Sequence, residues 1–276
     1  MTLIDSARLG GRARTTDKDG YRFNQGPHAV YLAGATGRVL QELGVSLPGG
    51  PPATGTASVV YRGEVHRLPA TPSLMVKSGL MGLADKARIG RLLARLPRLD
   101  TAALVDRSTT QWIDSLGLGD AAATLVATLI RIATYSADLD RLSADAGAAQ
   151  LRAAATGPGV HYLDGGWQRM VDELTAIATT ARARLIDHRP VRSIEAGPAG
   201  YRVATDGESI GAGALIMAAG SPATAERLLP GDHTYDGLGP DVTAVCLDLG
   251  LASAPDTAGH VRDGRAALLL DPLPAG

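Results

Sequence analysis

The sequence predicts an α/β protein of two domains, and three stretches of the chain carry this prediction. A short apolar strand at residues 2–4 ends in an acid and is followed at once by a glycine-rich loop. Residues 71–155 then have mostly helical spacing of apolar side chains. After a break at Gly157-Pro158-Gly159, an amphipathic helix at 167–181 leads into three strand candidates. Strands and helices therefore alternate around one long helical insert.

The loop after the first strand has the chemistry of a dinucleotide site. Gly10 and Gly11 lack Cβ atoms, which lets the backbone approach a ligand closely. Arg12 presents a fixed positive fork that suits phosphate oxygens. Asp5, at a strand end, can accept hydrogen bonds from the two hydroxyls of a ribose. The glycine fingerprint of a Rossmann unit lies roughly 20 residues before such an acid, whereas Asp5 is only the fifth residue here.

This order of residues resembles the superfamily of flavin-containing amine oxidases, protoporphyrinogen oxidases and phytoene desaturases. Those proteins carry GGRxxT after the acid, which residues 10–15 match, and a flavin-proximal turn that Gly26-Pro27 fits. The resemblance continues through most of the chain. It implies an incomplete Rossmann-like FAD-binding domain with FAD as cofactor, because GxGxxG and the closing Gly-Asp motif have no counterpart. We therefore expect a fragment of a longer enzyme.

The resemblance divides the chain into four segments. Residues 1–45 and 157–235 belong to the FAD-binding domain. Residues 46–156 and 236–276 belong to a second, α+β substrate domain, and the first of these two segments carries the helical insert.

Local signals predict the elements within these segments. A helical pattern at 29–45 precedes a loop at 46–57 and a hairpin at 59–69 that turns at Arg62-Gly63. The expected starts of the helices in the insert are Thr71, Ser108, Asp120 and Ser143. After the amphipathic helix we expect strands at 190–194, 201–205 and 214–219, a helix at 223–229, and strands at 242–249 and 265–270.

The resemblance also names candidate cofactor contacts. An isolated acid at a strand end is usually just solvated. The assignment of Asp5 to ribose binding therefore depends on the glycines and the arginine that follow it. Arg8 could equally be a solvated surface charge, and Val191 could be a core strand residue while its backbone contacts adenine. The implied FAD contacts are Asp5, Arg8, Gly10, Gly11, Arg12, Thr15, Gly26, Pro27 and Val191.

The catalytic residue is not identified by the sequence. His28 is a weak candidate for an acid or base, because histidine titrates near neutral pH but a single loop histidine carries no partner information. The other histidines lack metal-ligand spacing, so we expect no metal site. Cys246 falls in a predicted apolar strand, which is typical of a small core residue.

Composition limits the classes of function. The chain has 276 residues, 45% of them apolar, enough for one large domain or two moderate ones. A formal net charge of −1 argues against a nucleic-acid or anionic-membrane partner. One cysteine excludes an internal disulfide, and no signal peptide or membrane-length apolar run is evident. We therefore expect a reducing, cytoplasmic location.

The resemblance implies an FAD-dependent oxidoreductase that removes hydride from a small-molecule substrate, although the 276 residues alone are expected to be inactive. The helical insert is more similar to desaturases than to polar amine oxidases. It favours an apolar, isoprenoid-like substrate, and peripheral membrane association to reach such a substrate stays open. Two alternatives remain: a non-catalytic truncated remnant without bound flavin, and a flavin amine oxidase acting on an amine. The oligomeric state and the electron acceptor are not predicted.

Overall fold

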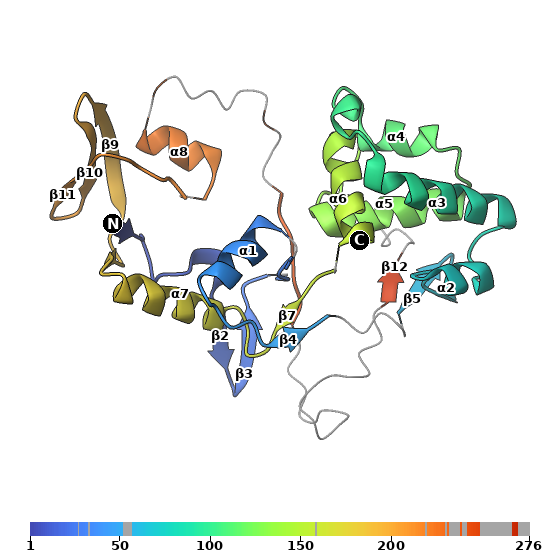
Figure 1. Ribbon diagram of the computed structural model, residues 1–276, viewed down its shortest axis with the longest axis horizontal. Coiled ribbons are helices and arrows are strands. Elements are labelled where there is room, and N and C mark those ends of the chain that lie inside the picture. Colours follow the sequence, from blue (N-terminus) through green and yellow to red (C-terminus); the bar gives the residue numbers. More distant parts are fainter. Residues whose placement is uncertain are drawn as a thin grey trace. The chain divides into compact units, whose positions relative to one another are not determined.

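The protein is divided into two compact units, each assembled from segments that are separated in the sequence (Figure 1). Unit 1 comprises Met1–His28, Val39–Pro48 and Leu163–Asp241, and unit 2 comprises Ala29–Arg38, Gly49–Tyr162 and Val242–Gly276. The computed structural model describes residues 1–26, 28–32, 34–51, 57–157, 159–218, 220–229, 231, 238, 242–248 and 267–269. The assignment of FAD-binding and substrate roles to the predicted segments stays a prediction.

Unit 1 contains a parallel strand pair, a hairpin and a three-stranded meander. Strand β1 (Thr2–Ile4) pairs in parallel with β8 (Arg184–Ile186). The hairpin joins β2 (Thr15–Lys18) to β3 (Tyr21–Asn24). The meander has the order β11-β10-β9 and consists of β9 (Val191–Gly197), β10 (Gly200–Thr205) and β11 (Ser209–Ala212).

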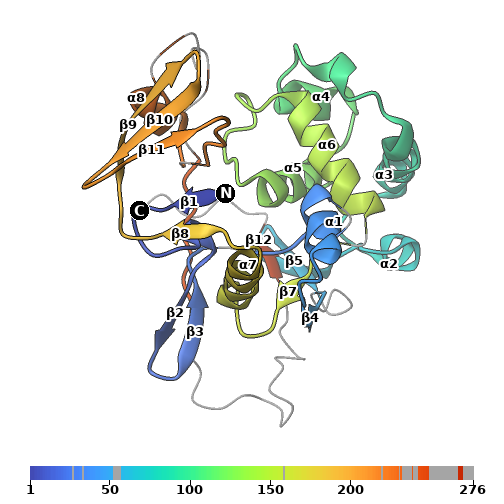
Figure 2. The same cartoon turned by 60° about the vertical axis from the view of Figure 1, so that its left-hand side comes forward.

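Two α-helices of unit 1 pack beside these strands. Helix α7 (Gln168–Thr180) confirms the predicted amphipathic helix and buries Met170 and Val171. Helix α8 (Pro222–Leu228) packs on β9, as Figure 2 shows, and its Leu228 joins Ile194 and Val203 in a small buried core. A short 3₁₀ turn, η1 (Gly11–Ala13), follows β1, and helix α1 (Ala35–Glu42) has residues in both units.

Unit 2 begins its sheet with the predicted hairpin. Strands β5 (Ser58–Tyr61) and β6 (Glu64–Arg67) pair in antiparallel, and β12 (Ala267–Leu269) adds to β5 in parallel. Arg62 and Gly63 both have positive φ, which suits the tight turns that match strand twist. Strands β4 (Gly49–Gly50) and β7 (Tyr162–Leu163) form a further two-stranded sheet, and β7 has one residue in each unit.

The helices of unit 2 enclose the largest core, with Leu96 and Ile130 fully buried. The side chains of Thr71, Ser108 and Ser143 accept hydrogen bonds from the first turns of their helices, as the sequence predicts. The helices are α2 (Pro72–Lys77), α3 (Leu83–Arg95), α4 (Thr109–Ser115), α5 (Asp120–Thr134) and α6 (Ala144–Thr156), with 3₁₀ turns η3 (Leu96–Arg98) and η4 (Ala102–Leu104). No helix in the described ranges is long and apolar enough to cross a membrane.

Four local predictions are wrong in the described part of the chain. Residues 214–218 and 242–248 form no strand, because an apolar run becomes a strand only where a neighbour supplies backbone hydrogen bonds. Cys246 is exposed and is not a core residue. Asp120 is the first residue of α5 and not its N-cap, which is Gly119.

Candidate functional site

The loop that follows β1 starts at the carboxyl ends of two parallel strands. The Asp5 amide donates to the carbonyl of Ile186 at 2.8 Å, and the Arg189 amide donates to the carbonyl of Asp5 at 3.0 Å. Strand β9 begins at Val191, two residues further along the chain. The structure therefore brings together two predicted cofactor contacts, Asp5 and Val191, at the sheet edge where α/β proteins bind ligands.

Asp5 is half-buried, and only one of its two carboxylate oxygens forms a hydrogen bond with the described part of the protein. Its Oδ1 accepts a hydrogen bond from the amide of Ala7 at 3.0 Å, which closes a local turn typical of aspartate. Among the described residues, no group donates to Oδ2. One carboxylate oxygen therefore holds the loop, and the other can accept a hydrogen bond from a ligand hydroxyl.

The two glycines of the loop have different roles. Both have positive φ, 105° at Gly10 and 51° at Gly11, a conformation that favours glycine. Gly10 packs against Val171 of α7 with no room for a Cβ, whereas a Cβ on Gly11 would meet nothing within 4 Å. Arg12 is exposed, and its guanidinium has no partner among the described residues. Gly11 and Arg12 therefore remain accessible to a phosphate.

Thr15 anchors the start of α7. Its hydroxyl donates to Oδ1 of Asn24 at 3.0 Å and accepts from the amide of Gln168 at 3.0 Å. The Trp167 amide donates to the same Asn24 oxygen at 2.9 Å. Gly166 faces this network, where a Cβ would lie 2.6 Å from Oγ1 of Thr15. Since its hydroxyl hydrogen is taken by Asn24, Thr15 has a structural role, and its predicted contact with the cofactor stays a prediction.

His28 links the turn at Gly26 to the loop at Arg12. Its Nε2 lies 2.6 Å from the carbonyl oxygen of Arg12, and because a carbonyl can only accept, the ring nitrogen is the donor. The His28 ring also packs on Trp167, with ring centroids 4.5 Å apart. These contacts favour a positioning role over acid–base catalysis. Gly26 has a φ of 102°, and Pro27 lies outside the described residues.

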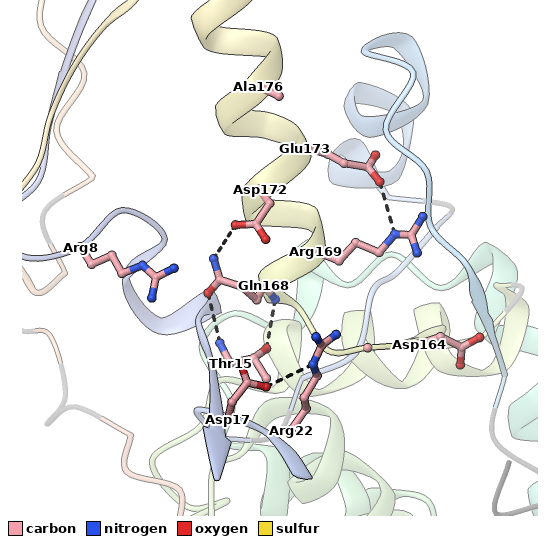
Figure 3. Close-up of a pocket in the computed structure, with 11 residues that line it drawn as sticks. Arg8, Thr15, Asp17, Arg22, Asp164, Gln168, Arg169, Asp172, Glu173 and Ala176 are labelled. Atoms are coloured by element: carbon pink, nitrogen blue, oxygen red, sulfur yellow. Dashed lines mark hydrogen bonds and ion pairs between the residues drawn. The ribbon is translucent and has the colours of Figure 1, made fainter. Parts of the chain in front are cut away.

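A pocket of about 620 Å³ lies between the β2–β3 hairpin and α7 (Figure 3). Of the predicted site residues it contains Arg8 and Thr15, and not Asp5, Arg12, His28 or Val191. The sequence did not point to its other side chains. The pocket is lined by Arg8, Thr15, Asp17, Arg22, Asp164, Gly165, Gln168, Arg169, Asp172, Glu173 and Ala176.

Charged groups dominate this pocket, and most of them are paired. Arg22 contacts Asp17 at 3.1 Å, and Arg169 contacts Glu173 at 3.3 Å. The first pair is largely exposed, so water screens it strongly. Arg8 has no side-chain partner in the described part of the chain and points into the pocket in Figure 3. The lining suits a polar ligand and not an apolar one.

Two signals could have revealed the pocket from the sequence. Asp19-Gly20, at the turn of the hairpin that holds Asp17 and Arg22, is a strong hairpin dipeptide. Gln168 and Asp172 are four residues apart on a helix and therefore share a face.

The described residues that fit a flavin nucleotide best belong to the loop after β1. Oδ2 of Asp5 suits a ribose hydroxyl, while the open face of Gly11 and the free guanidinium of Arg12 suit a pyrophosphate. Nε1 of Trp167, beside His28, is a buried donor with no acceptor among the described residues. Within the described ranges, no group of three acidic, histidine or cysteine side chains could hold a metal ion.

Comparison with known families gives one match. The family described as flavin containing amine oxidoreductase matches residues 5–243. No curated protein sequence matches the chain.

Many solved structures match the fold of this chain, among them the following three. The PF1083 protein of Pyrococcus furiosus is 18% identical with a TM-score of 0.60, and the match covers 82% of this chain and 54% of that one. An oxidoreductase of Methanosarcina mazei is 15% identical with a TM-score of 0.60, covering 76% and 51%. Putrescine oxidase bound to putrescine is 19% identical with a TM-score of 0.56, covering 77% and 51%. The chain thus spans about half the length of these structures.

Proposed function

Because the family match extends over most of its length, the chain belongs to the flavin-containing amine oxidoreductase family, and we propose that it is part of an FAD-dependent oxidoreductase. The observation that carries this proposal is the loop from Asp5 to Arg12, which lies at the carboxyl ends of β1 and β8 with an acceptor oxygen and a guanidinium unpaired among the described residues. Bound FAD would supply the hydride acceptor.

The chain's own residues would bind and orient the cofactor. Oδ2 of Asp5 accepts a hydrogen bond from the ribose, and Arg12 contacts the pyrophosphate through its fork of N–H groups. The backbone of Val191, on the segment hydrogen-bonded to Asp5, contacts the adenine. Nε2 of His28 holds the carbonyl of Arg12 and so fixes the loop that presents the guanidinium.

An apolar, isoprenoid-like substrate is the preferred substrate class. The support is the sequence of the helical insert at residues 71–155, which resembles desaturases more than polar amine oxidases. The alternative substrate is an amine, which the family's description favours and which putrescine oxidase binds in its solved structure. A third possibility is a remnant of the fold that binds no flavin.

Anaerobic flavin reduction separates these three candidates. A protein containing residues 1–276 is titrated with FAD by flavin fluorescence and then mixed with an acyclic polyene or with putrescine. We expect saturable FAD binding and loss of the oxidised flavin absorbance with the polyene. Reduction of the flavin by putrescine and not by the polyene would establish the amine alternative. Absence of FAD binding to the protein that contains residues 1–276 would establish the remnant.

A further inference from the structure

A row of arginines lies on the exposed side of α3 and η3. Arg88, Arg91, Arg95 and Arg98 follow one another at intervals of three, four and three residues, which places them on one helix face. All four are exposed. The opposite side of the helix buries Ile89 and other apolar side chains in the core of unit 2, so the row faces away from that core.

The charges of this row have little compensation within the protein. Arg88 pairs with Asp85 at 3.0 Å, whereas Arg91, Arg95 and Arg98 have no side-chain partner among the described residues. Like charges three or four residues apart destabilise a helix. Residues 72–98 contain six basic side chains and one acid, a net charge of +5 in a chain whose total is −1. A polyanionic partner would offset this local repulsion.

A second row, uncharged, runs beside the arginines. Leu83, Ala87, Gly90 and Ala94 are spaced four, three and four residues apart and are all exposed. Leu83 is 82% exposed at the first position of the helix. In Figures 1 and 2, α3 lies at the outer edge of the helices α3–α6. One surface of α3 therefore combines a cationic row with a row of one exposed leucine and three small residues.

We propose that these two rows of α3 form a docking surface for an anionic phospholipid bilayer. The guanidinium groups contact lipid phosphates, for which arginine has matching geometry, and Leu83 enters the boundary between headgroups and acyl chains. The exposed side chain of Leu83 favours a bilayer over a nucleic acid, which would need only the cations. The formal net charge of −1 argues against an anionic membrane as a partner. That value is a sum over the whole chain, and residues 72–98 alone carry a net charge of +5. The proposal is independent of the proposed oxidoreductase activity.

Vesicle co-sedimentation of the full chain tests this proposal. We expect binding to phosphatidylserine-containing vesicles, little binding to pure phosphatidylcholine, and weakening as salt is raised. The triple variant Arg91→Gln/Arg95→Gln/Arg98→Gln should lose partitioning on the order of a hundredfold, since each arginine near an anionic surface contributes roughly fivefold. Leu83→Ser should also weaken binding, with its salt dependence retained.

The matched control removes the same charge elsewhere. Arg38, Arg182 and Arg202 are exposed and have no side-chain partner among the described residues, and Arg38→Gln/Arg182→Gln/Arg202→Gln gives the same net charge. Circular dichroism verifies that both triple variants keep their helix content. An equal loss in both variants, or equal binding to the two kinds of vesicle, would overturn the proposal. So would binding to a DNA oligonucleotide that needs the α3 arginines while vesicle binding does not.

Discussion

Gly10 and Val171 are packed so closely that a Cβ on Gly10 would lie 2.8 Å from Cγ1 of Val171. Real Cβ contacts are essentially never this short. The contact fixes the loop after β1 on α7, which also carries several side chains of the polar pocket. A residue of the predicted glycine motif therefore serves packing, and its neighbour Gly11 remains open.

Replacing Gly10 by alanine should destabilise the protein by about 2–4 kcal/mol, because overpacking adds to the strain of a positive φ. Gly11→Ala is the matched control. Its φ of 51° is also strained, but its Cβ would meet nothing, so about 1 kcal/mol is expected. Urea unfolding gives both values, and equal losses would contradict the packing role of Gly10.

Asp5→Ala should weaken FAD binding roughly ten- to hundredfold, because a hydrogen bond to a charged group contributes about 1.5–3 kcal/mol. Asp5→Asn keeps an acceptor for the Ala7 amide and so separates loop stability from cofactor binding. It should unfold like the wild type and still bind FAD more weakly. Fluorescence titration measures the affinity, and an unchanged Kd in Asp5→Ala rules out the ribose assignment.

Thr15→Val should cost about 1–3 kcal/mol of stability, because it leaves Asn24 and the Gln168 amide without their hydroxyl partner. Thr15→Ser retains the hydroxyl and should remain close to the wild type. Thermal unfolding compares the two variants. If Thr15→Val instead lowers FAD affinity and leaves unfolding unchanged, Thr15 contacts the cofactor and does not anchor α7.

The pKa of Asp120 is lowered from its usual value, chiefly by the hydrogen bond from Tyr61. Desolvation, the next largest effect, raises this pKa, and the charge and hydrogen bond of Arg62 lower it further. Tyr61→Phe and Arg62→Gln should therefore each raise this pKa. The ionised Asp120 carboxylate therefore contributes to the stability of the fold. This contribution is complete above the ordinary pKa of aspartate and is lost as the pH falls through the lowered pKa of Asp120. NMR titration of the Asp120 carboxyl carbon measures both changes in pKa, and an unchanged pKa in Tyr61→Phe would contradict the role of the Tyr61 hydrogen bond.

Hairpins show how far local sequence signals extend. The β5–β6 hairpin is predictable because Arg62-Gly63 lies between apolar strands. The β2–β3 hairpin has the stronger turn signal, Asp19-Gly20, but its strands carry charged side chains instead of an apolar alternation. The apolar run at 214–218 is predicted to be a strand but forms none, and Ile216 is 93% exposed. Strand formation depends on a neighbouring strand, which no local sequence pattern reveals.

The candidate site also has a part that the sequence predicts and a part that it does not. The loop from Asp5 to Arg12 is predictable because acid, glycines and arginine are adjacent in the sequence. The polar pocket is not, because Arg8 and Asp172 share it only after α7 packs on the loop. Likewise, the role of His28 depends on Trp167 and on a backbone carbonyl, which no single-residue pattern encodes.

The anchoring of α7 by Asn24 and Thr15 has a consequence for the order of folding. The hydrogen bonds to the Trp167 and Gln168 amides close loops of 143 and 153 residues, and loop-closure entropy opposes such contacts until other structure has formed. The first turn of α7 therefore lacks its cap until the hairpin docks. Hydrogen exchange at these two amides reports that docking step, while amides in the middle of α7 report helix formation.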